Sequence, residues 1–217
     1  MSNGIVTIIG LNRIGTSAAY MLTKLEVEAL HLVDNGYVKD PLNEGMLYWF
    51  TDTGKRKVSA LYEKLSRINP NIDIALYETE VNERSISILS RISDCIIFTE
   101  QDLNTLLLVH KYSIKEKKPL IYAWTLGSTG FIYILVNRAT RLIDNIIDRR
   151  RHSKKIEGIF ENVVPDIVGL LVAYQAIRCI QRRPDENSIL IFDITRESIA
   201  REKWNQTKKY HNGTMIA

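Results

Sequence analysis

The sequence predicts a doubly wound α/β fold, with a mostly parallel sheet and an antiparallel C-terminal hairpin. In the first half of the chain, short apolar runs alternate with stretches of helical spacing. That alternation is typical of a parallel sheet covered by helices on both faces, joined by right-handed crossovers. Near the C-terminus, residues 188–194 and 198–203 follow each other as two strand-like runs separated by a short turn.

Strands are predicted at five apolar runs, which are residues 5–9, 29–33, 72–76, 95–98 and 120–124. Runs of this length between polar segments are typical of strands that are covered on both faces. Helices are predicted between the strands, where apolar residues recur at intervals of three and four, in residues 16–24, 58–68, 86–92 and 103–114. The second of these helices is expected to end at Asn69-Pro70, because helical backbone is disfavoured at the residue before a proline.

Residues 119–137 contain no charged side chain, and a stretch of that length could cross a bilayer. The Gly-Ser-Thr-Gly sequence at residues 127–130 divides it into two apolar runs, so we expect two core strands joined by a turn. An amphipathic helix over residues 137–151 and a more uniformly apolar, buried helix over residues 166–180 are expected to follow. The last residues are polar. We therefore predict one nucleotide-binding domain over residues 1–205 and a C-terminal tail over residues 206–217.

The charge of the chain is concentrated in one segment. The 217 residues include 29 Lys+Arg and 25 Asp+Glu, a net charge of +4. Residues 138–155 alone hold seven basic and two acidic side chains, so the rest of the chain is close to neutral. This basic segment is interpreted as a solvated helix and loop, as a surface for an acidic partner, or as a contact for nucleic acid. Nucleic acid is the least favoured, because the segment has no aromatic side chain for base stacking.

The cysteines and histidines do not suggest a metal site. Cys95 and Cys179 are too few for a four-thiolate zinc site, and both lie in apolar surroundings where a thiol is usually inert packing. The four histidines show no spacing typical of metal ligands. The chain enters its first apolar run after four residues, without a charged leader, so we expect a cytoplasmic protein that does not enter a membrane.

A glycine-containing loop follows the first predicted strand and opens the first predicted helix. In residues 10–15, Gly-Leu-Asn-Arg-Ile-Gly, Gly10 fits the tight turn and Gly15 fits close packing of helix on strand. The middle glycine of a dinucleotide-binding loop is replaced by Asn12, which adds a side chain. Asp34 ends the second predicted strand, where an acid can accept hydrogen bonds from ribose hydroxyls. A Rossmann-like nucleotide site is predicted; a loop that has lost its ligand is the alternative.

A longer series of motifs is more specific. It comprises Gly10 and Gly15, then Asp34, then residues 52–57 (Asp-Thr-Gly-Lys-Arg-Lys), 68–70 (Ile-Asn-Pro), 98–100 (Phe-Thr-Glu), 118–123 (Lys-Pro-Leu-Ile-Tyr-Ala), 127–130 and 164–165 (Val-Pro). Taken in order, these motifs resemble the ThiF/MoeB/HesA superfamily, the activating enzymes of ubiquitin-like and sulfur-carrier proteins. The resemblance covers nearly the whole chain.

The resemblance implies that the chain binds ATP with Mg²⁺ and acts on the C-terminal glycine of a small ubiquitin-like or sulfur-carrier protein. Such enzymes join that carboxylate to AMP, and the phosphoryl charge has to be stabilised by cations. Asp34 matches the family's ribose-binding acid, and Lys57 matches its phosphate-binding lysine. Glu100 stands in place of the metal-binding aspartate, and Asn43 lies in the segment that carries the family's Asn-x-x-Arg motif. These residues, with the loop, are the candidate cofactor-binding set.

The departures from the family pattern are equally informative. Glu44 stands where the family has its arginine, and an acid there would repel phosphate. No Cys-x-x-Cys pair is present, so no zinc is expected, and no cysteine falls where a thioester or persulfide nucleophile would be needed. Catalytic residues therefore remain unassigned. The pattern resembles the non-catalytic half of heterodimeric activating enzymes. The chain begins at its first strand, so we do not expect the arginine that such halves supply from an N-terminal helix.

Three hypotheses follow from the sequence. The first is an adenine-nucleotide-binding homologue of activating enzymes that is weakly active or a non-catalytic subunit, as a homodimer or as a heterodimer with a catalytic paralogue. The second is a dimerisation or interaction scaffold that has lost its nucleotide. The third is an NAD-dependent oxidoreductase that uses the same loop and Asp34, disfavoured because no catalytic pair is visible and residues 52–57 would have no role.

Overall fold

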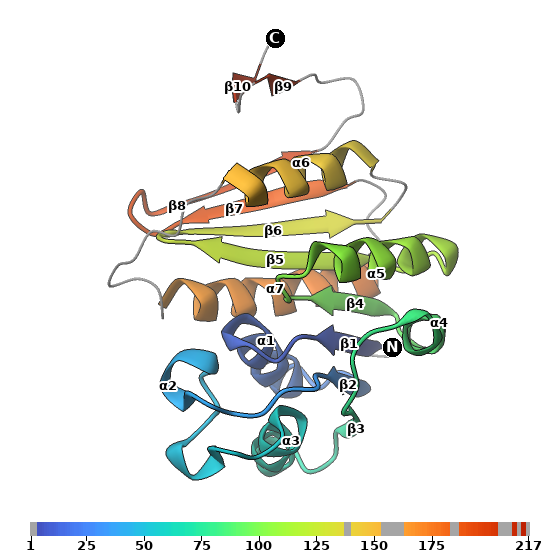
Figure 1. The fold of residues 1–217 in the computed structure, drawn as a ribbon, viewed down its shortest axis with the longest axis vertical. Coiled ribbons are helices and arrows are strands. Elements are labelled where there is room, and N and C mark those ends of the chain that lie inside the picture. The colour runs from blue at the N-terminus through green and yellow to red at the C-terminus, as the bar shows by residue number, and fades with distance from the viewer. Residues whose placement is uncertain are drawn as a thin grey trace.

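The computed structural model describes residues 4–136, 140–152, 163–182, 187–203, 210–211 and 214–215. A central eight-stranded sheet has the order β3-β2-β1-β4-β5-β6-β7-β8 and is covered by helices (Figure 1). Its strands are β1 (Ile5–Ile9), β2 (Ala29–Val33), β3 (Asp73–Tyr77), β4 (Cys95–Phe98), β5 (Leu120–Leu126), β6 (Thr129–Leu135), β7 (Ser188–Asp193) and β8 (Ser198–Lys203). The helices are α1 (Arg13–Lys24), α2 (Pro41–Glu44), α3 (Lys57–Ile68), α4 (Glu83–Ile92), α5 (Leu103–Lys115), α6 (Thr140–His152) and α7 (Val163–Arg182), with one 3₁₀ turn, η1 (Phe50–Asp52).

Strands β1 to β5 are parallel, and β6, β7 and β8 add to them in antiparallel order. This confirms the predicted doubly wound sheet with its antiparallel C-terminal hairpin. The order along the sheet reverses at β1, because the chain runs outward through β2 and β3 and then returns to place β4 on the other side of β1. The carboxyl ends of β1 and β4 therefore flank the topological switch point, which is where such sheets bind ligands.

Alternate residues of the central strands contribute to two separate cores. On one face, residues such as Ile8, Leu32 and Ile97 pack with side chains of α1, α3 and α7. On the other, residues such as Ile9 and Phe98 pack with side chains of α4, α5 and α6. Strands that bury both of their faces are mostly apolar along their whole length, which explains the continuous apolar runs in the sequence.

Capping side chains set several helix starts that the apolar spacing did not predict. Helix α1 begins three residues before its predicted start because Asn12 accepts hydrogen bonds from the backbone N–H groups of Ile14 and Gly15. Helix α4 begins at Glu83 because Asn82 caps it in the same way. The short elements α2 and η1 were not predicted, since four or three residues are too few to show a periodicity.

Within the uncharged stretch at residues 119–137, β5 and β6 form a hairpin, as predicted. Helix α7 is the one described helix that is long and apolar enough for a membrane span, over Val163–Gln181. It packs against α1 and against strands β4, β5 and β6, which is the position of a core helix. Within the predicted polar tail, β9 (Tyr210–His211) and β10 (Thr214–Met215) form a short antiparallel pair.

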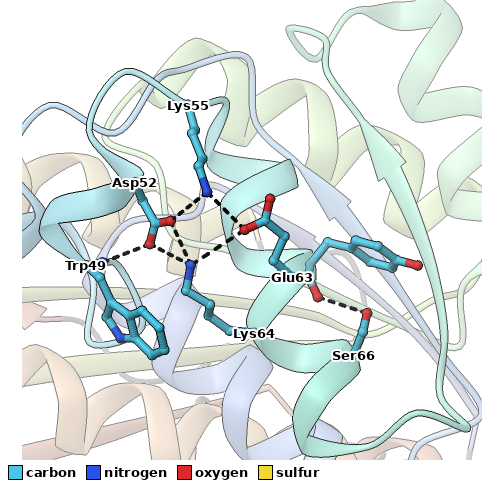
Figure 2. A network of polar contacts seen from close by, with 7 residues as sticks. Trp49, Asp52, Lys55, Glu63, Lys64 and Ser66 are labelled. Atoms are coloured by element: carbon cyan, nitrogen blue, oxygen red, sulfur yellow. Dashed lines mark hydrogen bonds and ion pairs between the residues drawn. The ribbon is translucent and has the colours of Figure 1, made fainter.

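A buried ion pair fixes the segment between α2 and α3 (Figure 2). Both carboxylate oxygens of Asp52 lie 2.7 Å from the Lys64 ammonium, with Asp52 fully buried and Lys64 6% exposed. The Trp49 backbone N–H and the Lys55 ammonium also donate to Asp52, at 2.9 and 3.1 Å. Burial by itself would raise the pKa of Asp52, but the hydrogen bonds from Lys64, Trp49 and Lys55 lower it below its usual value.

Removing one partner of this pair leaves the other charge buried and unpaired. We expect Lys64→Met to lower the free energy of unfolding by about 3–5 kcal/mol. The matched control is Lys55→Met, because Lys55 contacts the same carboxylate but is 40% exposed; its cost is expected to stay within about 1 kcal/mol. Urea denaturation measures both values, and equal losses in the two variants would contradict a dominant buried pair.

Candidate functional site

The glycine loop lies between the carboxyl ends of β1 and β4. Gly10 has φ +91°, and a Cβ at this position would lie 2.7 Å from Cγ of Glu100 and 2.8 Å from Oγ1 of Thr99. Thr99 Oγ1 donates to the Gly10 carbonyl at 2.7 Å. A Cβ on Gly15 would collide with that same carbonyl. Both glycines are therefore required by close approach, as the sequence predicted.

Asn12 occupies the N-terminus of α1. Its Oδ1 accepts from the N–H groups of Ile14 and Gly15 at 3.1 and 3.2 Å, and its Nδ2 donates to the Thr99 carbonyl at 2.6 Å. In phosphate-binding loops these free N–H groups bind the anion. Here the amide of Asn12 already accepts from two of them, so a phosphate at this position would have to compete with the cap.

Asp34, at the end of β2, holds the loop from the other side. Its Oδ2 accepts from the Leu11 N–H at 2.8 Å and its Oδ1 from the Gly36 N–H at 2.7 Å. Each carboxylate oxygen has a second lone pair, so Asp34 can still accept hydrogen bonds from a ribose. That Asp34 binds a ribose stays a prediction.

Lys57 and Glu44 form an ion pair beside Asp34. Lys57 begins α3 and Glu44 ends α2, and Nζ lies 3.2 Å from Oε2, with the side chains 16% and 22% exposed. The other oxygen, Oε1, accepts from the N–H groups of Lys39 and Asp40 at 3.3 and 3.2 Å. A Cβ at Gly36 would lie 2.9 Å from Oδ1 of Asp34 and 3.6 Å from Cδ of Lys57, which places Lys57 next to the Asp34 carboxylate.

Thr99 and Glu100 directly follow β4, and most of the charged side chains around Glu100 are acidic. Burial raises its pKa from 4.5 to about 7, and the negative charges of Asp34, Asp102 and Glu80 add to this rise. The positive charge of Lys57 acts in the opposite direction. Its neighbours thus include three acids and one lysine. Near neutral pH, Glu100 is therefore partly protonated, which weakens it as a metal ligand.

Six of the seven predicted residues meet at this end of the sheet: Gly10, Asn12, Gly15, Asp34, Lys57 and Glu100. Asn43 is the exception. Its side chain donates to Asp40 at 2.7 Å on the exposed side of α2, and among the described residues no hydrogen bond links it to the loop. The separation arises because α2 turns Glu44 toward Lys57, while Asn43 precedes it on a short helix.

Two side chains that support the site were not predicted. Tyr48 is buried and donates to the Leu11 carbonyl at 3.0 Å; burial, followed by the charges of Asp34, Glu44 and Asp52, raises its pKa. Arg13 donates to Asp166 of α7 at 2.9 Å and to the Leu42 carbonyl, so it ties α1 to α7 and to α2. Neither residue has a sequence signal, because their partners are far away along the chain.

The cysteines lie apart from this site, in the core between the sheet and α7. Cys95 and Cys179 are both buried and free. A hydrogen bond with Cys179, together with burial, raises the pKa of the Cys95 thiol. Across the residues that the structure describes, no group of three or more His, Cys, Asp or Glu side chains could hold a metal ion.

The basic segment is described only in part, as α6. Within it, the Arg149 guanidinium lies 5.6 Å from the centre of the Phe131 ring, so this arginine packs over the sheet. Residues 138–139 and 153–155, which hold three of the seven basic side chains, lie outside the described residues.

The switch-point loop and the acid after β2 define a Rossmann-like fold of the nucleotide-binding type. The ThiF family model matches residues 1–213, and the chain belongs to the ThiF family. This confirms the predicted resemblance.

The chain is similar to three known proteins. It is 28% identical over 144 residues to the sulfur carrier protein ThiS adenylyltransferase of Bacillus subtilis (strain 168), covering 65% of this chain and 43% of that protein. It is 23% identical to the protein HesA of Nostoc sp. (strain PCC 7120 / SAG 25.82 / UTEX 2576), covering 94% and 82%. Crystal structures of E. coli MccB with ATP, and with AMPCPP and MccA, superpose with a TM-score of 0.75 at 17% identity, covering 93% of this chain and 64% of MccB. These similarities relate the chain to enzymes that adenylate a sulfur-carrier protein. The region of similarity spans less than half the length of the ThiS adenylyltransferase.

The raised pKa of Glu100 predicts a pH-dependent stability. Between pH 4.5 and about 7, Glu100 keeps its proton in the folded state but loses it in the unfolded chain, so this residue lowers the stability as the pH rises through that interval. Glu100→Gln removes the effect. We expect it to raise the free energy of unfolding at pH 8 by about 1–2 kcal/mol, after a discount for partial exposure, and to change little at pH 4.

Denaturant titrations at pH 4, 6 and 8 measure this difference. The control is Glu83→Gln, because Glu83 is 67% exposed and pairs with Lys111, which is 65% exposed. A stability difference between Glu100→Gln and wild type that does not change with pH would contradict the assignment.

Proposed function

We propose that this chain keeps the nucleoside half of an ATP site and, by itself, adenylates weakly or not at all. The ion pair between Lys57 and Glu44, at 3.2 Å, carries the proposal. Charge that develops on phosphoryl oxygens has to be met by cations. The one lysine that matches the family pattern is here neutralised by an acid, which itself stands in the place of the family's arginine.

The nucleoside half of the site is supported by separate observations. Asp34 retains lone pairs for ribose hydroxyls while two backbone N–H groups hold its carboxylate in place. Gly10 keeps the loop backbone close to β4. For ATP that arrives with Mg²⁺, carboxylates are the usual protein ligands of the metal, and Glu100 and Asp34 are the candidates. The triphosphate fits the present residues poorly, because Asn12 caps the helix and Glu44 neutralises Lys57.

The partners follow from the relatives. One relative is named for the sulfur carrier ThiS, and MccB has been crystallised with MccA. We therefore infer that this chain handles a small sulfur-carrier or ubiquitin-like protein as a subunit of a dimer, whose second member is another copy or a catalytic paralogue. We also infer a soluble, cytoplasmic protein, since the apolar helix α7 packs as a core helix. Nucleic acid and a membrane are not among the inferred partners.

The scaffold hypothesis remains the second candidate, and one observation favours it. The Asn12 side chain accepts from N–H groups that a phosphate would otherwise use. A scaffold of this kind would bind neither ATP nor AMP, whereas the first proposal requires binding of both through the ribose. The ThiF family assignment gives no support to the nicotinamide-dependent oxidoreductase.

Freeing Lys57 from Glu44 should improve the phosphate half of the site. We expect Glu44→Gln to tighten ATP binding about tenfold, or about 1.4 kcal/mol, while AMP binding changes less because its single phosphate interacts less with Lys57. Isothermal titration calorimetry measures both affinities. Adding Lys57→Ala to Glu44→Gln should abolish the gain. The matched control Glu63→Gln removes one of the two acids paired with the neighbouring Lys55 and should leave the ATP affinity unchanged.

ATP–pyrophosphate exchange tests the catalytic part of the proposal. We expect no measurable exchange by the wild type with candidate carrier proteins alone, and exchange when a catalytic paralogue is added. Vigorous exchange by the wild type alone would overturn the non-catalytic assignment. Absence of both ATP and AMP binding in calorimetry would leave the scaffold as the better account.

A further inference from the structure

The charged side chains around the glycine loop leave an excess of negative charge. Glu100 lies against the loop, since a Cβ at Gly10 would be 2.7 Å from Cγ of Glu100. Asp34 accepts a hydrogen bond from a loop N–H at 2.8 Å. Lys57 lies next to Asp34 and is paired with Glu44 at 3.2 Å. Three acids thus stand beside one lysine, and with all four ionised their net charge is 1 − 3 = −2.

The other two basic side chains near the loop do not offset this charge. Arg13 belongs to the loop, but its guanidinium lies 2.8 Å from Asp166 of α7 and also donates to the Leu42 carbonyl. Arg56 lies 3.6 Å from Glu78. A phosphate that recruited one of these arginines would have to draw it away from an acid, just as it would have to draw Lys57 away from Glu44.

One acceptor beside the site lacks a donor. Oε2 of Glu44 is buried and, within the part of the chain that the structure describes, accepts no hydrogen bond, although the Lys57 ammonium lies 3.2 Å away as its ion-pair partner. Buried polar atoms in folded proteins usually have a hydrogen-bond partner. A ligand that brings an N–H group or a positive charge would stabilise this oxygen, whereas a phosphate oxygen would be a further acceptor beside it.

The position of a bound nucleoside decides which part of it meets these charges. In Rossmann-like folds, the acid after the second strand holds the ribose, and the group attached to C5′ extends toward the loop and the start of the first helix. In this chain that direction leads to Gly10 and Glu100 and to the capped N-terminus of α1, where Asn12 already accepts from two N–H groups. The 5′ group is therefore the part of the ligand that the acids select.

We propose that the site prefers a nucleoside whose 5′ group is positively charged, a sulfonium or an ammonium, to a nucleoside phosphate. The inference rests on the proposed function, which supplies the adenine nucleoside and the ribose contact of Asp34, and it names the class of ligand for that same site. A positive charge is attracted by Glu100, Asp34 and Glu44, whereas the charge of a phosphate is repelled by them.

Titration calorimetry with two matched ligands tests the proposal on the full chain. S-adenosylmethionine and S-adenosylhomocysteine differ by one methyl group and one positive charge. We expect the sulfonium to bind about tenfold more tightly. In a second series without the amino-acid tail, 5′-amino-5′-deoxyadenosine is expected to bind more tightly than adenosine, and adenosine more tightly than AMP. Raising the ionic strength should narrow both differences, because salt screens attraction and repulsion alike.

Two variants show whether the acids cause the preference. Glu44→Gln is expected to weaken binding of 5′-amino-5′-deoxyadenosine about threefold, because it removes one acid and frees Lys57. The affinity for adenosine should stay the same, which also shows that the variant is folded. The matched control Glu63→Gln lies outside the site, pairs with Lys55, and should change neither affinity.

Two results would overturn this inference and leave the proposed function standing. They are equal affinities for S-adenosylmethionine and S-adenosylhomocysteine, and tighter binding of AMP or ATP than of adenosine. Absence of binding by every one of these nucleosides and nucleotides would overturn both proposals, because the ribose contact of Asp34 is common to all of them.

Discussion

The segment between α2 and α3 is held in place by the buried contact between Asp52 and Lys64. This contact joins the turn after α2 to the middle of α3. A buried ion pair is stable only where its geometry is good and further hydrogen bonds satisfy the two charged groups. Lys57 begins the same helix that carries Lys64, and the exposed Trp49 and Phe50 lie in the turn that carries Asp52. One buried contact therefore connects the helix of the site residue Lys57 with this turn.

The glycine loop and the charged residues of the site point to different conclusions about nucleotide binding. The loop keeps two closely packed glycines, and an acid stands at the end of β2. The proposal that the site holds a triphosphate weakly rests on the charges, because the lysine is paired and the acid Glu100 lies among other acids. A ThiF-family chain that binds nucleoside and leaves the chemistry to another subunit agrees with both sets of observations.

The family assignment and the structure bear on different questions. The match over residues 1–213 establishes ancestry and fold. It does not establish activity, because the ThiS adenylyltransferase extends well beyond the region of similarity and because the fold of MccB is shared at only 17% identity. The deciding features are local, above all the acid at position 44 and the amide at position 12. Their effect depends on the neighbours that the fold brings to them.

The sequence by itself determined the features that depend on local spacing. Continuous apolar runs predicted the strands, the glycine spacing predicted the loop, and the ordered motifs indicated the family. It also raised Glu44 as a misfit. Only the tertiary structure decided what that misfit does, since Glu44 and Lys57 meet across α2 and α3. It likewise brought Thr99 to Asn12, Arg13 to Asp166 and Lys64 to Asp52. Sequence periodicity predicts which face of its own helix or strand a residue lies on. Pairs that are distant along the chain become neighbours only when the sheet order and the helix packing are fixed, so no local pattern records them.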